Sequence, residues 1–390
     1  MEKPIGRIAV EGARWRAFKR GLQTVHLWLG LILGIPIIVI GLSGSALLVQ
    51  REILSYSVPA ATATGAQASL TRMIAAAQTG APANATPRNI VLPPRAGAPA
   101  TVQFDFGGRP PRSVVYVDPV SLAVLGTDAV VARGPILGFL IDTHAFLGMP
   151  STTGLRIVGW MAVAMTFMAL SGLVLWWPRK GSWLQAFWIK PGAKGLRFHV
   201  ELHHVVGFWG SAVFLAMGIS GIYLVFPEAF RHGVEAVLPA GLGSGDAPLS
   251  HQPVAGALDA DGAVAAALAV LPNTHALNVQ LPPNLNLPFV VQLETTEFRP
   301  QVPPILVSLN ARTSEITFVD DPRTYSLGDK VLNLQHAIHF GIGLGWLWKV
   351  LVFVSGLLPL ALGITGLTIW LKRRVRRSPL PEALANPAAE

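Results

Sequence analysis

Residues 21–50 read GLQTVHLWLGLILGIPIIVIGLSGSALLVQ, and this stretch contains no Asp, Glu, Lys or Arg. A helix needs about 20 consecutive apolar residues to cross the hydrocarbon core of a bilayer. Three further runs meet this requirement: Ile157–Trp177, Val205–Phe226 and Val350–Leu371. The sequence therefore predicts an integral membrane α-helical bundle of four transmembrane helices. We interpret the first run as a retained helix, because it is longer than the apolar region of a signal peptide.

The composition of the whole chain agrees with a membrane protein. Of its 390 residues only 13% are charged and 51% are hydrophobic, whereas a soluble domain carries about 25% charged residues. The chain has no cysteine, which excludes disulfides, thiolate metal sites, iron–sulfur clusters and covalent haem attachment. The ten histidines are then the remaining strong ligands for a soft metal.

Basic residues predict the orientation of the chain. The net charge is +9, and more than half of the 30 basic residues lie in the short segments 1–20, 178–198 and 372–377. Short loops rich in Lys and Arg stay in the cytoplasm. Both termini and the middle loop are therefore expected in the cytoplasm and the two long segments outside it. Because the charge follows the membrane topology, it does not indicate a nucleic-acid partner.

The chain also repeats itself. The first and third spans each carry a histidine that is followed 17 residues later by Ser-Gly, and the second and fourth each end in Ser-Gly or Thr-Gly before a tryptophan. The residues are His26 with Ser43-Gly44, His203 with Ser220-Gly221, Ser171-Gly172 and Thr365-Gly366. This pattern predicts an internal duplication of a helix–domain–helix unit, used twice in one orientation.

Each long outer segment is predicted to fold as an α+β domain, with one helix on a small antiparallel sheet. The helices are expected at 70–78 and 263–271, and alternating strands at 101–106, 114–118, 289–293 and 305–310. Segments 60–69 and 241–253 are expected to be linkers. The predicted order is cytoplasmic 1–20, helix 21–50, outer domain 51–143, lead-in and helix 144–177, cytoplasmic loop 178–198, helix 199–226, outer domain 227–335, lead-in and helix 336–371, and cytoplasmic tail 372–390.

Six histidines are expected to form two layers, one at each face of the bilayer. Ionisable residues in membrane spans are costly and mark functional sites. Two helices that each supply one imidazole at the same depth can hold a haem iron axially. We pair His26 with His203 in the inner layer, with His199 as the alternate, and His144 with His339 in the outer layer, with His336 as the alternate.

Other polar residues near these layers receive weaker predictions. His204 points about 100° away from His203 on a helix and is a weaker candidate for a ligand than His203. Arg156 and Lys349 could contact haem propionates or only the membrane interface. Zinc is a weaker alternative, because it prefers four ligands. The other three histidines, His232, His251 and His275, are expected to be solvated.

The chain resembles the PepSY-associated transmembrane proteins, also described as PiuB-like, iron-regulated membrane proteins. The resemblance extends from about Arg14 to Arg377 and rests on HLWLG at 26–30, THAFLG at 143–148, HVELH at 199–203 and IHFG at 338–341. It implies a bacterial inner-membrane protein whose outer domains are PepSY-like. Some members are FoxB-type di-haem ferric-siderophore reductases, which implies two non-covalent b-type haems held by the membrane histidines.

The expected function is therefore transfer of electrons across the bilayer to a ferric chelate such as a siderophore in the periplasm. The cytoplasmic segments are too short to fold a flavin domain, so quinol or a separate donor must supply the electrons. Two alternatives stay open. One is a membrane-anchored PepSY protein that binds peptides or regulates a protease, and the other is a transporter lined by histidines.

Overall fold

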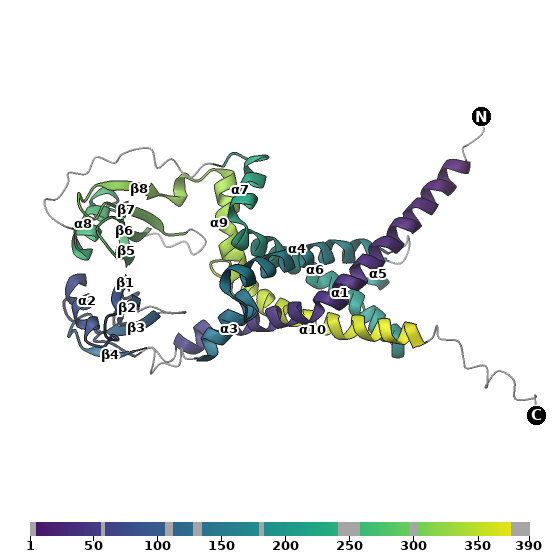
Figure 1. The fold of residues 1–390 in the computed structure, drawn as a ribbon, viewed down its shortest axis with the longest axis horizontal. Coiled ribbons are helices and arrows are strands. Elements are labelled where there is room, and N and C mark those ends of the chain that lie inside the picture. Colours follow the sequence, from purple (N-terminus) through teal and green to yellow (C-terminus); the bar gives the residue numbers. More distant parts are fainter. Residues whose placement is uncertain are drawn as a thin grey trace, which may run out of the picture.

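The computed structural model describes residues 5–55, 59–105, 112–127, 135–178, 183–240, 258–295 and 303–375. These residues form a bundle of long helices and an antiparallel sheet that lies beyond one end of the bundle (Figure 1). Helix α1 (Ile5–Ser55) begins, and helix α10 (Gly345–Val375) ends, at the opposite end of the bundle from the sheet. His251 and the predicted linker 241–253 fall in a segment that lies outside the described residues.

Four helices are long and apolar enough to cross a membrane, which confirms the predicted number: α1, α4 (Ser151–Trp176), α6 (Gly195–Val225) and α10. Large apolar side chains cover their outer surfaces; Ile35 is 75% exposed and Trp346 is 77% exposed. A water-soluble bundle would bury such side chains. The chain is therefore a membrane protein. α1 begins well before the predicted residue 21, because a helix can continue through polar residues where it leaves the bilayer.

The two predicted lead-ins are separate helices. α3 (Pro135–Phe146) precedes α4, and α9 (Leu327–Phe340) precedes α10. The turn after α3 contains Gly148 with φ +70°, and the turn after α9 starts at Gly341 with φ +62°. Glycine adopts this left-handed backbone without the steric cost of a Cβ. These turns set α3 and α9 apart from the long helices, so each lead-in that was expected at the start of 144–177 and 336–371 is the end of a separate short helix.

Small residues bring the long helices close together. α1 packs against α4 and α10, and α6 packs against the same two helices. At the crossing of α1 and α10, a Cβ on Gly41 would lie 2.5 Å from the carbonyl oxygen of Gly356. Beside it, the Ser45 hydroxyl donates a 2.7 Å hydrogen bond to the Phe353 carbonyl. Close backbone approach of this kind is the usual way helices associate in lipid.

The outer strands form one sheet, which differs from the prediction of two separate domains. The first four are β1 (Thr86–Val91), β2 (Ala100–Asp105), β3 (Arg112–Val117) and β4 (Val124–Thr127). The second four are β5 (Thr274–Gln280), β6 (Phe289–Thr295), β7 (Ile305–Leu309) and β8 (Ile316–Asp320). Their order is β4-β3-β2-β1-β5-β6-β7-β8, and all neighbours are antiparallel.

The junction of the sheet joins equivalent strands of the two halves. Ile90 of β1 lies opposite Val279 of β5, flanked by the pairs Asn89–Gln280 and Val91–Asn278. Separate sheets would leave β1 and β5 as unpaired edges, which attract other strands. Pairing them removes both edges. The side chains of Ile90 and Val279 are fully buried in the common core.

Two short helices cover the sheet on the face that points away from the bundle (Figure 1). They are α2 (Leu70–Gln78), as predicted, and α8 (Ala260–Val270), which starts three residues before the expected 263–271. Asp261 of α8 accepts hydrogen bonds from the backbone N–H groups of Leu70 and Thr71 at 2.7 and 2.9 Å. One core and this contact therefore bind the two halves into a single outer domain.

The same order of elements occurs in each half: helix, four strands, short helix and long helix. Three smaller elements complete the described chain: α5 (Trp183–Ala186), α7 (Pro227–Glu235) and the 3-10 helix η1 (Pro322–Thr324). α5 follows α4 at the end of the bundle away from the sheet, whereas α7 lies beside α9 near the sheet (Figure 1).

Candidate functional site

The inner histidines face hydroxyl groups of neighbouring helices. His26 of α1 has its Nδ1 atom 2.8 Å from the hydroxyl oxygen of Ser171, near the end of α4. His203 of α6 has its Nδ1 atom 2.9 Å from the hydroxyl oxygen of Thr365 in α10. Both hydroxyl-bearing residues are only 3% exposed. Each of the four long helices therefore contributes one member of a histidine–hydroxyl pair to this layer.

The outer histidines are carried by the short helices and not by the long ones. His144 of α3 has its Nδ1 atom 2.8 Å from the backbone carbonyl oxygen of Ile40 in α1. His339 of α9 has its Nδ1 atom 3.1 Å from the hydroxyl of Ser220 in α6, which is fully buried. The turns that end α3 and α9 thus place these two rings against the sheet-proximal halves of α1 and α6.

The partners determine which ring nitrogen carries the hydrogen. The hydroxyls of Ser171, Ser220 and Thr365 already donate to carbonyls in the preceding turn of their own helices, at 3.1, 3.2 and 2.7 Å. Their oxygens can therefore accept a hydrogen bond from Nδ1–H of the imidazole while their own hydrogens bind the helix. The Ile40 carbonyl can only accept, so Nδ1–H of His144 is the donor in that contact. A ring that donates through Nδ1–H keeps on Nε2 the lone pair that a metal requires.

Glycines make room for all four rings. A Cβ on Gly44 would lie 2.7 Å from Cε1 of His144, closer than side chains approach. On Gly172, Gly221 and Gly366, the Cβ would lie 3.5, 3.7 and 3.5 Å from Cε1 of the histidine that each one faces. Each of the four Ser-Gly or Thr-Gly pairs that mark the repeat in the spans therefore has a histidine ring against it.

The two outer rings face each other at a distance that suits one metal between them. The ring centroids of His144 and His339 are 6.2 Å apart, and the ring planes are inclined by 56°. A metal lies about 2 Å from an imidazole nitrogen, and the ring centre is roughly 1.1 Å further away. Two imidazoles on opposite sides of one metal therefore have centroids about 6.3 Å apart, close to the observed distance.

The layers lie near opposite ends of the bundle. His26 and Gly44, which touches the outer ring of His144, are 18 residues apart in α1, and so are His203 and Gly221 in α6. With a rise of 1.5 Å per residue, the layers are about 27 Å apart along the helices. The hydrocarbon core of a bilayer is about 30 Å thick. Within the inner layer, His26 and His203 are close enough to interact electrostatically.

The alternate ligands have different surroundings. The Nδ1 atom of His199 is buried without a hydrogen-bond partner, and its ring packs against Phe198 at 5.7 Å. His336 stacks on Phe340, with ring centroids 6.1 Å apart, and meets the edge of Tyr223 at 5.4 Å. Neither ring has the hydroxyl or carbonyl partner and the neighbouring glycine that the other four share.

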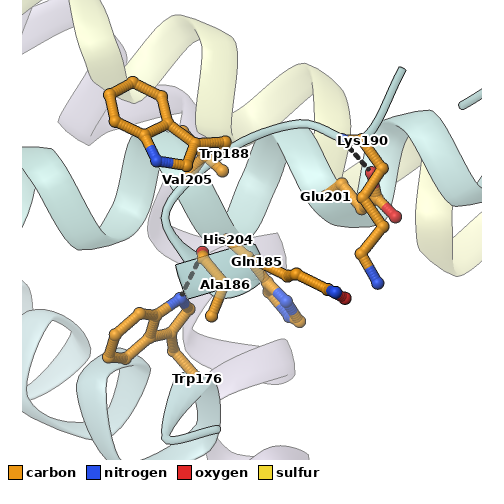
Figure 2. A pocket seen from close by; sticks show the side chains of 8 residues that line it. All are labelled: Trp176, Gln185, Ala186, Trp188, Lys190, Glu201, His204 and Val205. Carbon is orange, nitrogen blue, oxygen red and sulfur yellow. Dashed lines mark hydrogen bonds between the residues drawn. The ribbon is translucent and has the colours of Figure 1, made fainter. Parts of the chain in front are cut away.

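The remaining described histidines belong to neither pair. His204 lines a separate cavity beside the inner layer (Figure 2). In the outer part of the chain, the side chains of His232 and His275 are 75% and 52% exposed and lie 3.4 and 3.2 Å from Glu235 and Glu294. These two have the solvated surroundings that were predicted for them.

Arg156 and Lys349 are the two basic residues that were expected near the outer layer, as partners of haem propionates or of the membrane interface. Arg156 is exposed on α4, whereas the backbone of Lys349 lies beside Gly341, two residues after His339. Lys349 is therefore the one that the fold brings near the outer pair. Within the described ranges, no group of three or more His, Asp or Glu side chains is placed to hold a metal ion. Pairs of imidazoles are what a macrocycle that supplies the other ligands requires.

The hydroxyl partners are the site residues that sequence reasoning missed. Ser171, Ser220 and Thr365 were expected only as small residues, and their hydrogen bonds to histidines were not predicted. Their depth in the membrane could have indicated these contacts. Ser171 lies near the end of the second span, at the same face of the bilayer as His26 near the start of the first span. Ser43 breaks the pattern, because its hydroxyl donates only to Val39 and Ile40 in its own helix.

Comparison with protein families identifies the chain's family. The family model described as PepSY-associated TM region matches residues 23–373, nearly the whole chain. The matched range includes all four histidines that lie against a Ser-Gly or Thr-Gly pair. No curated protein matches the chain.

Proposed function

The chain belongs to the PepSY-associated transmembrane family, and we propose that it carries electrons across a bacterial inner membrane through two b-type haems. We further propose that it reduces a ferric chelate, such as a siderophore complex, on the outer side. One observation carries the proposal: four imidazoles form two layers, and each is held through Nδ1 by a hydroxyl or carbonyl oxygen, so that Nε2 is the nitrogen through which each would bind a metal.

The donor set fits haem. A haem iron needs only two axial protein ligands and exchanges single electrons between its ferric and ferrous states. His144 and His339, whose ring centroids lie 6.2 Å apart, would hold one haem. His26 and His203 would hold the other. The hydrogen bonds to Nδ1 fix each ring and raise its basicity, which strengthens ligation and lowers the reduction potential of the bound group.

The spacing of the layers suits transfer across a membrane. A carrier at each layer would divide a path of about 27 Å along the helices into shorter steps. The apolar helices around it exclude water, which keeps the electron from other acceptors. The outer pair lies on the side of the sheet domain, and we assign that domain to the covering or binding of the chelate.

Basic and aromatic residues at the end of the bundle opposite the sheet support the proposed orientation in the membrane. Arg374 stacks over Trp370 at 5.1 Å and Lys19 over Trp15 at 5.4 Å. Basic and aromatic residues together are typical of a membrane interface on the cytoplasmic side. We therefore assign this end to the cytoplasm and the sheet domain to the periplasm, and we interpret the two matching halves as the product of a duplication.

Visible spectroscopy of the purified full-length chain tests the proposal. We expect a reduced-minus-oxidised spectrum of bis-histidine haem, with about two haems per chain. With reductant supplied to the inner side of proteoliposomes, a ferric chelate outside should be reduced. The matched control is His275→Ala, which removes an exposed histidine and should leave the spectrum unchanged. A chain that stays colourless when haem is supplied would contradict the proposal.

A further inference from the structure

A cavity opens beside the inner histidines at the end of the bundle away from the sheet. Its volume is about 190 Å³, and it lies between the end of α4, the segment 183–190 and the first turns of α6. The lining residues that matter here are Trp176, Gln185, Trp188, Lys190, Glu201 and His204 (Figure 2). None of them has a role in the proposed function. His204 is joined by one peptide bond to His203, so the cavity is adjacent to the inner pair.

The polar side of the cavity is formed by the side chains of Gln185, Lys190, Glu201 and His204. Glu201 accepts a 2.9 Å hydrogen bond from Nε of Arg197 and another of 2.9 Å from the backbone N–H of Lys190. These contacts hold its carboxylate in place and compensate its charge. His204 and Gln185 lie toward the middle of the view in Figure 2, where the imidazole and the amide add further donors and acceptors.

The other walls are aromatic and reach the lipid. Trp176 stacks on Phe208 at 4.1 Å and donates its indole N–H to the Ala186 carbonyl at 3.2 Å, which fixes the ring. Trp188 is 67% exposed and lies 6.1 Å from the ring of Trp209, which is 57% exposed. Exposed indoles on a membrane protein lie at the lipid–water interface. A ligand could therefore enter this cavity from the bilayer.

From this combination we propose that the cavity binds the head group of a membrane hydroquinone. A flat six-membered ring suits the aromatic walls, and its two hydroxyls can donate hydrogen bonds to His204 and Glu201. The apolar tail of the hydroquinone can remain in the lipid. The volume is below the roughly 300 Å³ of a pocket for a drug-sized ligand, so a flavin or nicotinamide cofactor does not fit.

The chemistry balances when the hydroquinone is the two-electron donor. It loses two electrons and two protons and becomes the quinone. The two hydroxyl protons pass to water at the same face. The two electrons leave singly, through the one-electron carrier that His26 and His203 hold under the proposed function. This transfer rests on the proposed function, whereas binding of the ring does not.

Calorimetric titration of the full-length chain in detergent with decylubiquinone tests the site, with and without supplied haem. His204→Asn is expected to weaken binding by about tenfold or more, since it removes a hydrogen bond to the ring. Trp188→Ala, at a mostly exposed position, is a second variant with the same expected direction. His232→Asn is the matched control and should bind like the unchanged chain. Haem content, read from absorbance, should be equal in all four.

Reduction of the bound haem by decylubiquinol, followed in a stopped-flow spectrometer, should slow in His204→Asn at equal haem content. Equal affinity of decylubiquinone for the unchanged chain and both variants would overturn the proposal. Absence of binding, or occupation by a short-chain phosphatidylglycerol in its place, would also overturn it. Tight, His204-dependent binding by a chain that takes up no haem would support the site while contradicting the proposed function.

Discussion

The inner and outer histidine layers use the same kind of ring contact but are built differently. The inner rings of His26 and His203 belong to the long helices α1 and α6. The outer rings of His144 and His339 belong to short helices, which reach the bundle through turns at Gly148 and Gly341. The inner layer therefore forms once the spanning helices assemble. The outer layer also needs α3 and α9 to fold back against α1 and α6.

The chain connects the sheet domain directly to the helices that carry the outer histidines. α3 follows the first four strands, and α9 follows the last four through η1. Because the strands form one sheet, the helices of the two outer ligands both follow strands of the same sheet. The inner ligands lack such a connection. We expect the outer layer to be the more sensitive of the two to changes in helix position.

The largest effect is expected from removal of a ligand. His144→Ala should abolish the outer haem and leave the inner one, so that the chain retains about one haem in place of about two. His26→Ala should do the reverse. The measurement is the haem-to-protein ratio, together with the potential of the haem that remains. If both variants keep the full content, the pairing is wrong, and His199→Ala and His336→Ala become the next tests.

Loss of a hydroxyl partner should weaken one layer only. Ser220→Ala leaves Nδ1 of His339 without its acceptor, and Thr365→Val does the same for His203. Loss of such a partner typically costs 10–100-fold in affinity for the bound metal group. Ser43→Ala is the matched control, because the acceptor of His144 is a backbone carbonyl, and it should retain haem. Haem transfer to apo-myoglobin measures the affinities, and equal values for Ser220→Ala and Ser43→Ala would contradict the assignment.

A methyl group added beside a ring should distinguish the layers by steric fit. Gly44→Ala would put a Cβ 2.7 Å from the ring of His144, at a cost of about 1–3 kcal/mol. Gly172→Ala meets the inner ring of His26 at 3.5 Å, an ordinary contact, and should have little effect. Gly34→Ala, which meets nothing within 4 Å on the same helix, is the control. Haem occupancy of the outer site should fall only in Gly44→Ala.

The smallest effect is expected from acid and should be confined to the sheet domain. Burial raises the pKa of Asp118, but hydrogen bonds from the Thr62 hydroxyl and the backbone N–H groups of Ser121, Thr62 and Val120 outweigh it. The pKa is therefore held well below its ordinary value. A lowered folded-state pKa stabilises the fold above the unfolded value of about 3.9, and this stability is lost as the pH falls below it.

We therefore expect hydrogen exchange in β3 and β4 to accelerate between about pH 5 and pH 2, relative to the intrinsic rate. Exchange in the middle of α1 and α6 should stay slow. Asp118→Asn should already exchange faster at neutral pH and depend less on acid. The same acid response in the variant and the unchanged chain would show that this carboxylate is not responsible.

Much of the fold could be predicted because it depends on local patterns. Uncharged runs of membrane length gave the four spans, and the helix at 70–78 begins at Ser69, whose hydroxyl caps it by accepting from the N–H of Arg72 at 3.3 Å. The single sheet was not predictable in this way. Backbone hydrogen bonds between β1 and β5 carry no residue-specific signal, and either strand could have remained an edge.

For the candidate site, the sequence by itself determined depth and chemistry. Hydropathy and charge are properties of short segments, so they placed the histidines near the two faces of the bilayer, and the lack of cysteine left imidazole as the ligand type. Only the tertiary structure decided which group each ring contacts. His26 meets Ser171 across 145 positions of sequence, and this contact depends on how each helix is rotated about its axis. That rotation is fixed by the packing of all neighbouring helices together, and no local pattern contains it.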